Sequence, residues 1–183
     1  MKSYRIEIKL NKTQSELIKK SCNVSRHAYN WMLGKKIDEY ETLKSLEKMY
    51  DLEKVPSIHG SYFSWHKEWI IYKQDKSWIK EVSKCCGQEA LRDLETAFKR
   101  FFSKKSGFPK FKKKNGKDSF KVDGQVFIDY DKVQLPVIGK VRLKEKGYST
   151  DKRMKLSSVT VSREVDRWFV SFFIKDQIVI PKL

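Results

Sequence analysis

The sequence predicts an α+β fold in which a small β-barrel carries a helical lobe inserted after its first strand. Residues 4–10 alternate apolar and polar side chains, as a half-buried strand does. Between residues 12 and 103 the apolar side chains recur every three or four positions, which indicates amphipathic helices. Beyond residue 116, short runs rich in β-branched and aromatic residues return. An isolated strand is unstable, so we expect the first strand to pair with these later ones.

We expect a barrel domain from residues 1–11 and 118–176, a helical lobe from 12–117, and a tail at 177–183. Thr13 followed by Glu16 resembles a capping box, and the first helix is expected to close near Gly34, before a second one. Two more helices are expected at 62–72 and 78–102, the latter broken near Gly87. The expected later strands are 119–122, 126–130, 132–135, 140–143, 157–162 and 168–174, the last two forming a hairpin.

Charge points to the class of partner. The 183 residues carry a formal net charge of +17, which favours nucleic acid over acidic protein or a membrane surface. No run approaches the ~20 apolar residues that span a bilayer, and the first ten residues do not resemble a signal peptide. We therefore expect no membrane partner and a cytoplasmic protein. Its three cysteines, two of them adjacent, are expected to be reduced.

Most of the excess charge lies in one stretch, here called the basic segment (residues 99–117). It holds nine Lys or Arg and no Asp or Glu, interrupted by phenylalanines and a Gly-Phe-Pro turn. Phosphates supply the missing counter-charge, and Phe rings either pack into the fold or stack on unpaired bases. A solvated surface loop is the alternative. The RNA-binding candidates here and on the first strand are Arg5, Lys9, Lys104, Lys105, Lys110, Lys112, Lys113, Lys114 and Lys117.

Two polar clusters on predicted helices are candidates for DNA contacts. Lys84, Gln88 and Arg92 recur every four residues on the face away from the apolar stripe, so they would follow a groove or the phosphates. Arg26, Tyr29 and Asn30 form the second cluster, in which Asn can pair with adenine and Arg can reach guanine or phosphate. An exposed helix face explains the first cluster as well, and local packing explains the second.

The residues give no sign of intrinsic catalysis. A metal-dependent nuclease needs several carboxylates that converge on Mg²⁺, and only Asp129 and Asp131, at the end of a predicted strand, invite the comparison. Charges alternating along an exposed strand face explain this pair better. The cysteines and histidines lack the spacing of a zinc site, and no phosphate-binding glycine loop is present. We expect a binding protein with no metal or cofactor of its own.

Several motifs in this order resemble the N-terminal half of the TnpB (OrfB) family, the transposon-encoded relatives of type V CRISPR effectors. Gly-Phe-Pro-Lys-Phe-Lys at 107–112 is the most specific of them. The resemblance extends over nearly the whole of residues 1–175. The other motifs lie at 4–6, 11–14, 25–31, 77–82, 88–94, 97–102, 135–141 and 167–171.

The resemblance implies a prokaryotic protein in which a wedge barrel and a recognition lobe hold a structured guide RNA and a target double-stranded DNA. Protein contacts would read a short DNA motif beside the guide-paired target. In TnpB the strand resembling residues 168–174 is soon followed by a RuvC nuclease, whereas this sequence ends at Leu183. Cleavage by this chain alone is not expected: the chain is either the recognition half of a split effector, working with a separate RuvC-domain protein that binds Mg²⁺, or a nuclease-less derivative. A helix-turn-helix-like DNA-binding protein (repressor or transposition accessory) and a truncated fragment are alternatives.

Overall fold

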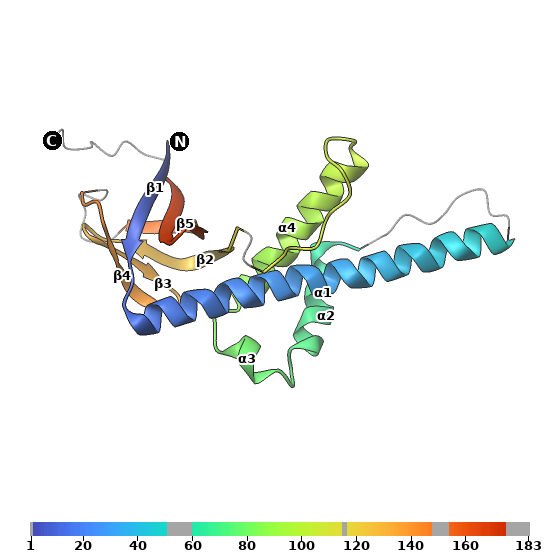
Figure 1. The fold of residues 1–183 in the computed structure, drawn as a ribbon, viewed down its shortest axis with the longest axis horizontal. Helices are drawn as coiled ribbons and strands as arrows, with labels where there is room; N and C mark the ends of the chain where they lie inside the picture. Colours follow the sequence, from blue (N-terminus) through green and yellow to red (C-terminus); the bar gives the residue numbers. More distant parts are fainter. Residues whose placement is uncertain (1, 51–59, 115–116, 148–153, 175–183) are drawn as a thin grey trace.

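A closed six-stranded β-barrel forms one end of the molecule (Figure 1). The computed structural model describes residues 2–50, 60–114, 117–147 and 154–174. Neighbouring strands are antiparallel around the ring, in the order β1-β4-β3-β2-β5-β6. The strands are β1 (Lys2–Lys9), β2 (Ser119–Ile128), β3 (Lys132–Leu135), β4 (Gly139–Leu143), β5 (Met154–Glu164) and β6 (Arg167–Ile174). The predicted pairing of the N-terminal strand with the later ones, and with it the α+β fold class, is confirmed.

Alternate side chains of each strand point inward and fill the barrel. Ile6, Val161 and Val170 are fully buried, and Val161 lies opposite Val170 in the β5–β6 hairpin, as the sequence predicted. The runs expected as two strands at 119–122 and 126–130 are instead one strand, β2. A β-bulge between Asp123 and Val126, with Gly124 at φ +83°, lets the strand bend without ending.

A single helix, α1 (Lys12–Tyr50), leaves the end of β1 and runs past the barrel (Figure 1). At about 1.5 Å per residue it is roughly 58 Å long. The expected helix end at Gly34 is wrong, because one interior glycine costs only about 1 kcal/mol, less than the surrounding packing supplies. All buried side chains of α1 lie between Ile18 and Lys36, and its last turns project beyond the other helices. In the described ranges no helix has the length and apolarity needed to cross a membrane.

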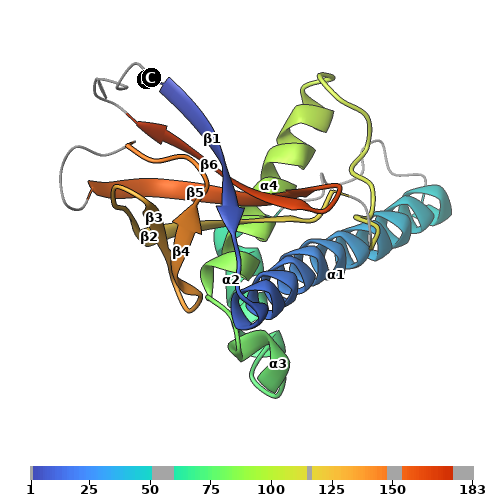
Figure 2. The same ribbon diagram turned by 60° about the vertical axis from the view of Figure 1, so that its left-hand side comes forward.

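Three shorter helices pack around the middle of α1 (Figure 2): α2 (Tyr62–Tyr72), α3 (Ser77–Lys80) and α4 (Cys85–Phe102). Leu91 and Leu94 of α4 are fully buried, as the apolar stripe predicted. The expected break near Gly87 lies a few residues earlier, between α3 and α4, and Gly87 is helical. A Cβ at Gly87 would lie 2.6 Å from Nε1 of Trp69, so α2 and α4 approach each other as closely as they do only because Gly87 has no side chain.

Candidate nucleic-acid interface

The basic segment turns back at the end of α4 and returns along that helix to cross α1 before entering β2 (Figures 1 and 2). Its Gly-Phe-Pro turn makes the return possible. Phe108 packs edge-on against Phe98 and Phe101, with ring centroids 5.7 and 5.2 Å apart, and Pro109 is buried. Phe111 remains 53% exposed. Packing into the fold, one of the two roles predicted for the phenylalanines, therefore applies to Phe108, whereas the ring of Phe111 is exposed to solvent.

Two residues of α1 hold the middle of the basic segment in place. Asn30 donates from Nδ2 to the carbonyl oxygen of Lys112 (2.9 Å) and accepts from the Lys112 backbone N–H at Oδ1 (2.8 Å). The Lys112 ammonium lies 4.2 Å from the ring centroid of buried Tyr29, in cation–π geometry. An adenine contact by Asn30, one of the sequence predictions, would require both hydrogen bonds to break. Asn30 and Tyr29 instead position the segment.

Where the segment crosses α1, a cationic cavity of about 290 Å³ opens beneath it. Arg26 of α1 lines it from one side, and the basic segment supplies Lys112, Lys113 and Lys117. Asp118, the first acidic residue after the segment, also lines it, with Nη1 of Arg26 3.3 Å from its Oδ1. Because one carboxylate faces four cations, the cavity keeps a net positive charge suited to phosphate.

The electrostatics under the segment involve Asp93 of α4, which the sequence reasoning did not single out. Burial raises the pKa of its carboxyl, and the Lys112 and Lys121 ammonium groups oppose that shift. Partial burial lowers the pKa of Lys112 although much of its side chain is exposed, and Asp93 opposes this change in turn. The signal that could have revealed Asp93 is its position four residues after Glu89, on the α4 face that meets Lys121 of β2.

The remaining RNA-binding candidates do not all join this site. Lys104, Lys105, Lys110 and Lys114 are exposed along the basic segment. Arg5 and Lys9 lie on β1, which the strand order places across the barrel from β2 and the end of the segment. Arg5 is already engaged, because its Nη2 lies 2.6 Å from Oε2 of Glu164 and its guanidinium stacks 4.3 Å from the Phe169 ring. Lys9 is exposed.

The predicted polar ridge on α4 is partly covered by α2. Nε2 of Gln88 lies 2.7 Å from Nε2 of His66, and the Arg92 guanidinium lies over the Tyr62 ring, 4.3 Å from its centroid. Lys84 precedes the first residue of α4 and is exposed. Of the three, Gln88 is half-buried under α2, while Arg92 and Lys84 are exposed on either side of it; the DNA contact of these residues stays a prediction.

The sequence separated RNA candidates on the basic segment from DNA candidates on the helices, but the structure brings part of each set together. Arg26, Tyr29 and Asn30 lie beneath Lys112, whereas Gln88 and Arg92 contact α2. The resulting site can bind phosphates through its cations and contact a base through Phe111. In the described part of the chain no group of three or more His, Cys, Asp or Glu could hold a metal ion.

Comparison with known proteins identifies relatives of this chain. Residues 1–45 match the family HTH_OrfB_IS605, a helix-turn-helix domain, although the structure has one strand and one unbroken helix there. The chain is homologous to two curated proteins. It is 30% identical over 125 residues to "Putative RNA-guided DNA endonuclease InsQ" of Escherichia coli (strain K12), covering 67% of this chain and 30% of that protein. It is 32% identical over 115 residues to "Putative RNA-guided DNA endonuclease" of Streptomyces pristinaespiralis, covering 57% and 27%. The match thus spans under a third of each relative.

Proposed function

We propose that this chain, with its OrfB-type N-terminal domain and its homology to proteins named as RNA-guided DNA endonucleases, is the guide-RNA-binding and target-DNA-recognition unit of such a system. The observation that carries the proposal is the basic segment folded onto α1 above the cationic cavity. Because the segment is already held in place on α1, it does not have to be ordered when it meets a phosphate backbone, and this lowers the entropic cost of binding.

In this proposal the cavity takes phosphates of the structured RNA, and exposed Phe111 stacks on an unpaired base. Arg92 and Lys84, on either side of Gln88, contact the target duplex. In this proposal the partition between RNA and DNA follows from shape: a cavity receives a strand that bends into it, whereas exposed cationic side chains on the outside of the fold suit the backbone of a duplex.

Replacing Lys110, Lys112, Lys113 and Lys114 with Gln tests the role of the basic segment. Each phosphate contact contributes about 0.7 to the slope of log affinity against log salt for a single strand and about 0.9 for duplex DNA, so the slope should flatten by up to about 3. The RNA that co-purifies with the protein from its native cells serves as the ligand. The control removes the same charge from four exposed lysines elsewhere, Lys44, Lys48, Lys67 and Lys155. Equal losses in both variants would refute the assignment, because only total charge would matter.

We also propose a second chain with a RuvC domain as the partner that supplies cleavage and binds Mg²⁺. The support is the homology to proteins named as RNA-guided DNA endonucleases. Purification from native cells, followed by identification of co-purifying chains, tests this. A RuvC-domain protein recovered in constant ratio supports the pairing, and its absence from an RNA-loaded preparation contradicts it.

A second function, sequence-specific DNA binding without RNA, is favoured by one observation, the match of residues 1–45 to a helix-turn-helix domain. Selection of bound sequences from random duplex DNA, using protein freed of RNA, separates the two. Enrichment of one motif by RNA-free protein supports this second function. Enrichment that requires the co-purified RNA supports guide-dependent recognition instead.

A further inference from the structure

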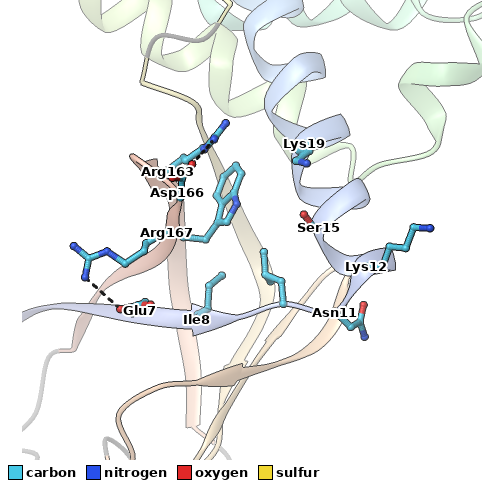
Figure 3. A pocket seen from close by; sticks show the side chains of 11 residues that line it. Glu7, Ile8, Asn11, Lys12, Ser15, Lys19, Arg163, Asp166 and Arg167 are labelled. Carbon is cyan, nitrogen blue, oxygen red and sulfur yellow. Dashed lines mark hydrogen bonds and ion pairs between the residues drawn. The ribbon is translucent and has the colours of Figure 1, made fainter.

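A second, larger cavity lies where β1 passes into α1, beside the β5–β6 hairpin (Figure 3). Its volume is about 400 Å³. Lys12, Ser15 and Lys19 on the first turns of α1 form one side, and Arg163 and Arg167 of the β5–β6 hairpin form the other. None of these five residues belongs to the interface described above.

The start of α1 is fixed to the barrel, so this cavity has a defined shape. Asn11 caps the helix: its Oδ1 accepts from the Gln14 backbone N–H (2.8 Å), and Gln14 Oε1 accepts from the Asn11 N–H (3.2 Å). Gln14 Nε2 also donates to the carbonyl oxygen of Lys140 in β4 (2.9 Å). The capping box is therefore Asn11–Gln14 and not the Thr13–Glu16 pair expected from the sequence, because the helix begins two residues earlier.

The charges around this cavity are unevenly neutralised. On the hairpin side, Nη2 of Arg163 lies 3.3 Å from Oδ1 of Asp166, and Nη1 of Arg167 lies 3.7 Å from Oε2 of Glu7 (Figure 3). On the helix side, neither Lys12 nor Lys19 forms an ion pair with any described residue. Both lysines are exposed. Lys12 lies in the first turn of α1, where its own charge and the positive end of the helix dipole both stabilise an anion.

An apolar wall distinguishes this cavity from a simple anion site. Ile8, Leu10 and Trp168 line it beside the charged residues, and Trp168 lies opposite Ile8 in the β1–β6 pairing. A volume of about 400 Å³ is within the range of sites for small organic ligands and exceeds what one phosphate needs. A duplex keeps its bases stacked inside, so only an unpaired residue can place both a phosphate and a base in such a space.

We propose that the cavity between the start of α1 and the β5–β6 hairpin binds one unpaired nucleotide of a single strand. Lys12 and Lys19 contact its phosphates, and the base lies against the wall formed by Ile8, Leu10 and Trp168. This inference rests on the proposed nucleic-acid function and adds to it a second contact point, lined by residues outside the basic segment. RNA and DNA share the required chemistry, so the test includes both.

The test combines affinity with cross-linking. Short oligo(U) carrying 4-thiouridine, oligo(dT) carrying 4-thiothymidine and a blunt DNA duplex carrying 4-thiothymidine are each bound to the full chain, and cross-linked peptides are identified by mass spectrometry. We expect at least one single strand to cross-link to the peptide containing Trp168. A cross-link from oligo(U) identifies RNA as the ligand, and one from oligo(dT) identifies DNA. Recovery of this peptide with the duplex alone overturns the proposal.

The double variant Lys12→Gln/Lys19→Gln should lose this cross-link and flatten the salt slope for the single strand by about 1.4, for two phosphate contacts. Lys44→Gln/Lys48→Gln removes the same charge from exposed positions on the same helix and is the matched control. If both variants behave alike while the variant of the basic segment weakens binding, this inference fails and the proposed function stands. If the unmodified chain binds neither strands nor duplex, the proposed function itself fails.

Discussion

Replacing Asn30 with Ala should release the basic segment from α1 and weaken nucleic-acid binding. The side chain of Asn30 makes two hydrogen bonds with the backbone of Lys112, at 2.8 and 2.9 Å. No other hydrogen bond in the described part of the chain joins residues 103–114 to α1. Alanine removes both bonds and leaves the charge of the segment unchanged. Any loss of affinity would therefore report positioning of the segment and not loss of its cations.

The magnitude follows from these contacts. A hydrogen bond of this kind contributes about 1 kcal/mol net, so the two together hold the segment by about 2 kcal/mol. Since about 1.4 kcal/mol is a tenfold change in an equilibrium constant, complete loss of docking would reduce affinity by up to about 30-fold. The cation–π contact between Lys112 and Tyr29 remains in the variant and retains part of the docking. We expect a reduction of about threefold to 30-fold with an unchanged salt slope, because no phosphate contact is deleted.

Two measurements check this expectation: filter binding of the co-purified RNA across a salt series, and hydrogen exchange at the Lys112 amide. Exchange should accelerate, because the amide loses the acceptor that now protects it. Thr42→Ala is the control; it removes a side-chain hydrogen bond elsewhere on α1, from Oγ1 to the carbonyl oxygen of Asp38. If Asn30→Ala leaves both the affinity and the exchange rate unchanged, the basic segment is not positioned by this residue and the reasoning fails.

Three further predictions concern the stability of the scaffold. Gly87→Ala should lower the free energy of unfolding in urea despite the higher helix propensity of Ala, because the new Cβ would lie 2.6 Å from Trp69; Gly107→Ala, which meets nothing within 4 Å, should be nearly neutral. Glu89→Ala should lower the free energy of unfolding by about 2 kcal/mol in the same assay, because it removes the buried carboxylate that pairs with Arg92 and Lys121; an unchanged midpoint would contradict this. Burial, aided by a nearby lysine, lowers the pKa of His27 below 6.5. Because the unfolded chain then binds the His27 proton at a higher pH than the folded chain does, the free energy of unfolding should fall as the pH drops through 6.5. In His27→Gln, the free energy of unfolding should differ less between about pH 7.5 and about pH 5.5 than it does in the unmodified chain.

Much of the fold could be predicted because local patterns and long-range pairing agree. Alternation in β1 and in the later strands required partners for the N-terminal strand, and the β5–β6 hairpin could be placed from Val165 and Asp166 alone. The errors arose where local signals were weak. Gly34 is a common helix terminator, yet it lies inside α1 because residues on both sides of it are buried against other elements. The two runs flanking Gly124 predict separate strands, because a bulge cannot be recognised without its partner strand.

By itself, the sequence determined the strongly positive net charge and its concentration in the basic segment, because net charge and its clustering are properties of the chain. It also determined the apolar faces of the helices, since their periodicity is local. Only the tertiary structure decided which cations act together. Arg26 and Lys112 are 86 positions apart in the sequence and line one cavity, while Gln88 lies four positions from Lys84 and is covered by α2. The physical reason is that a cavity forms where separate elements pack, and packing depends on contacts between residues remote in sequence.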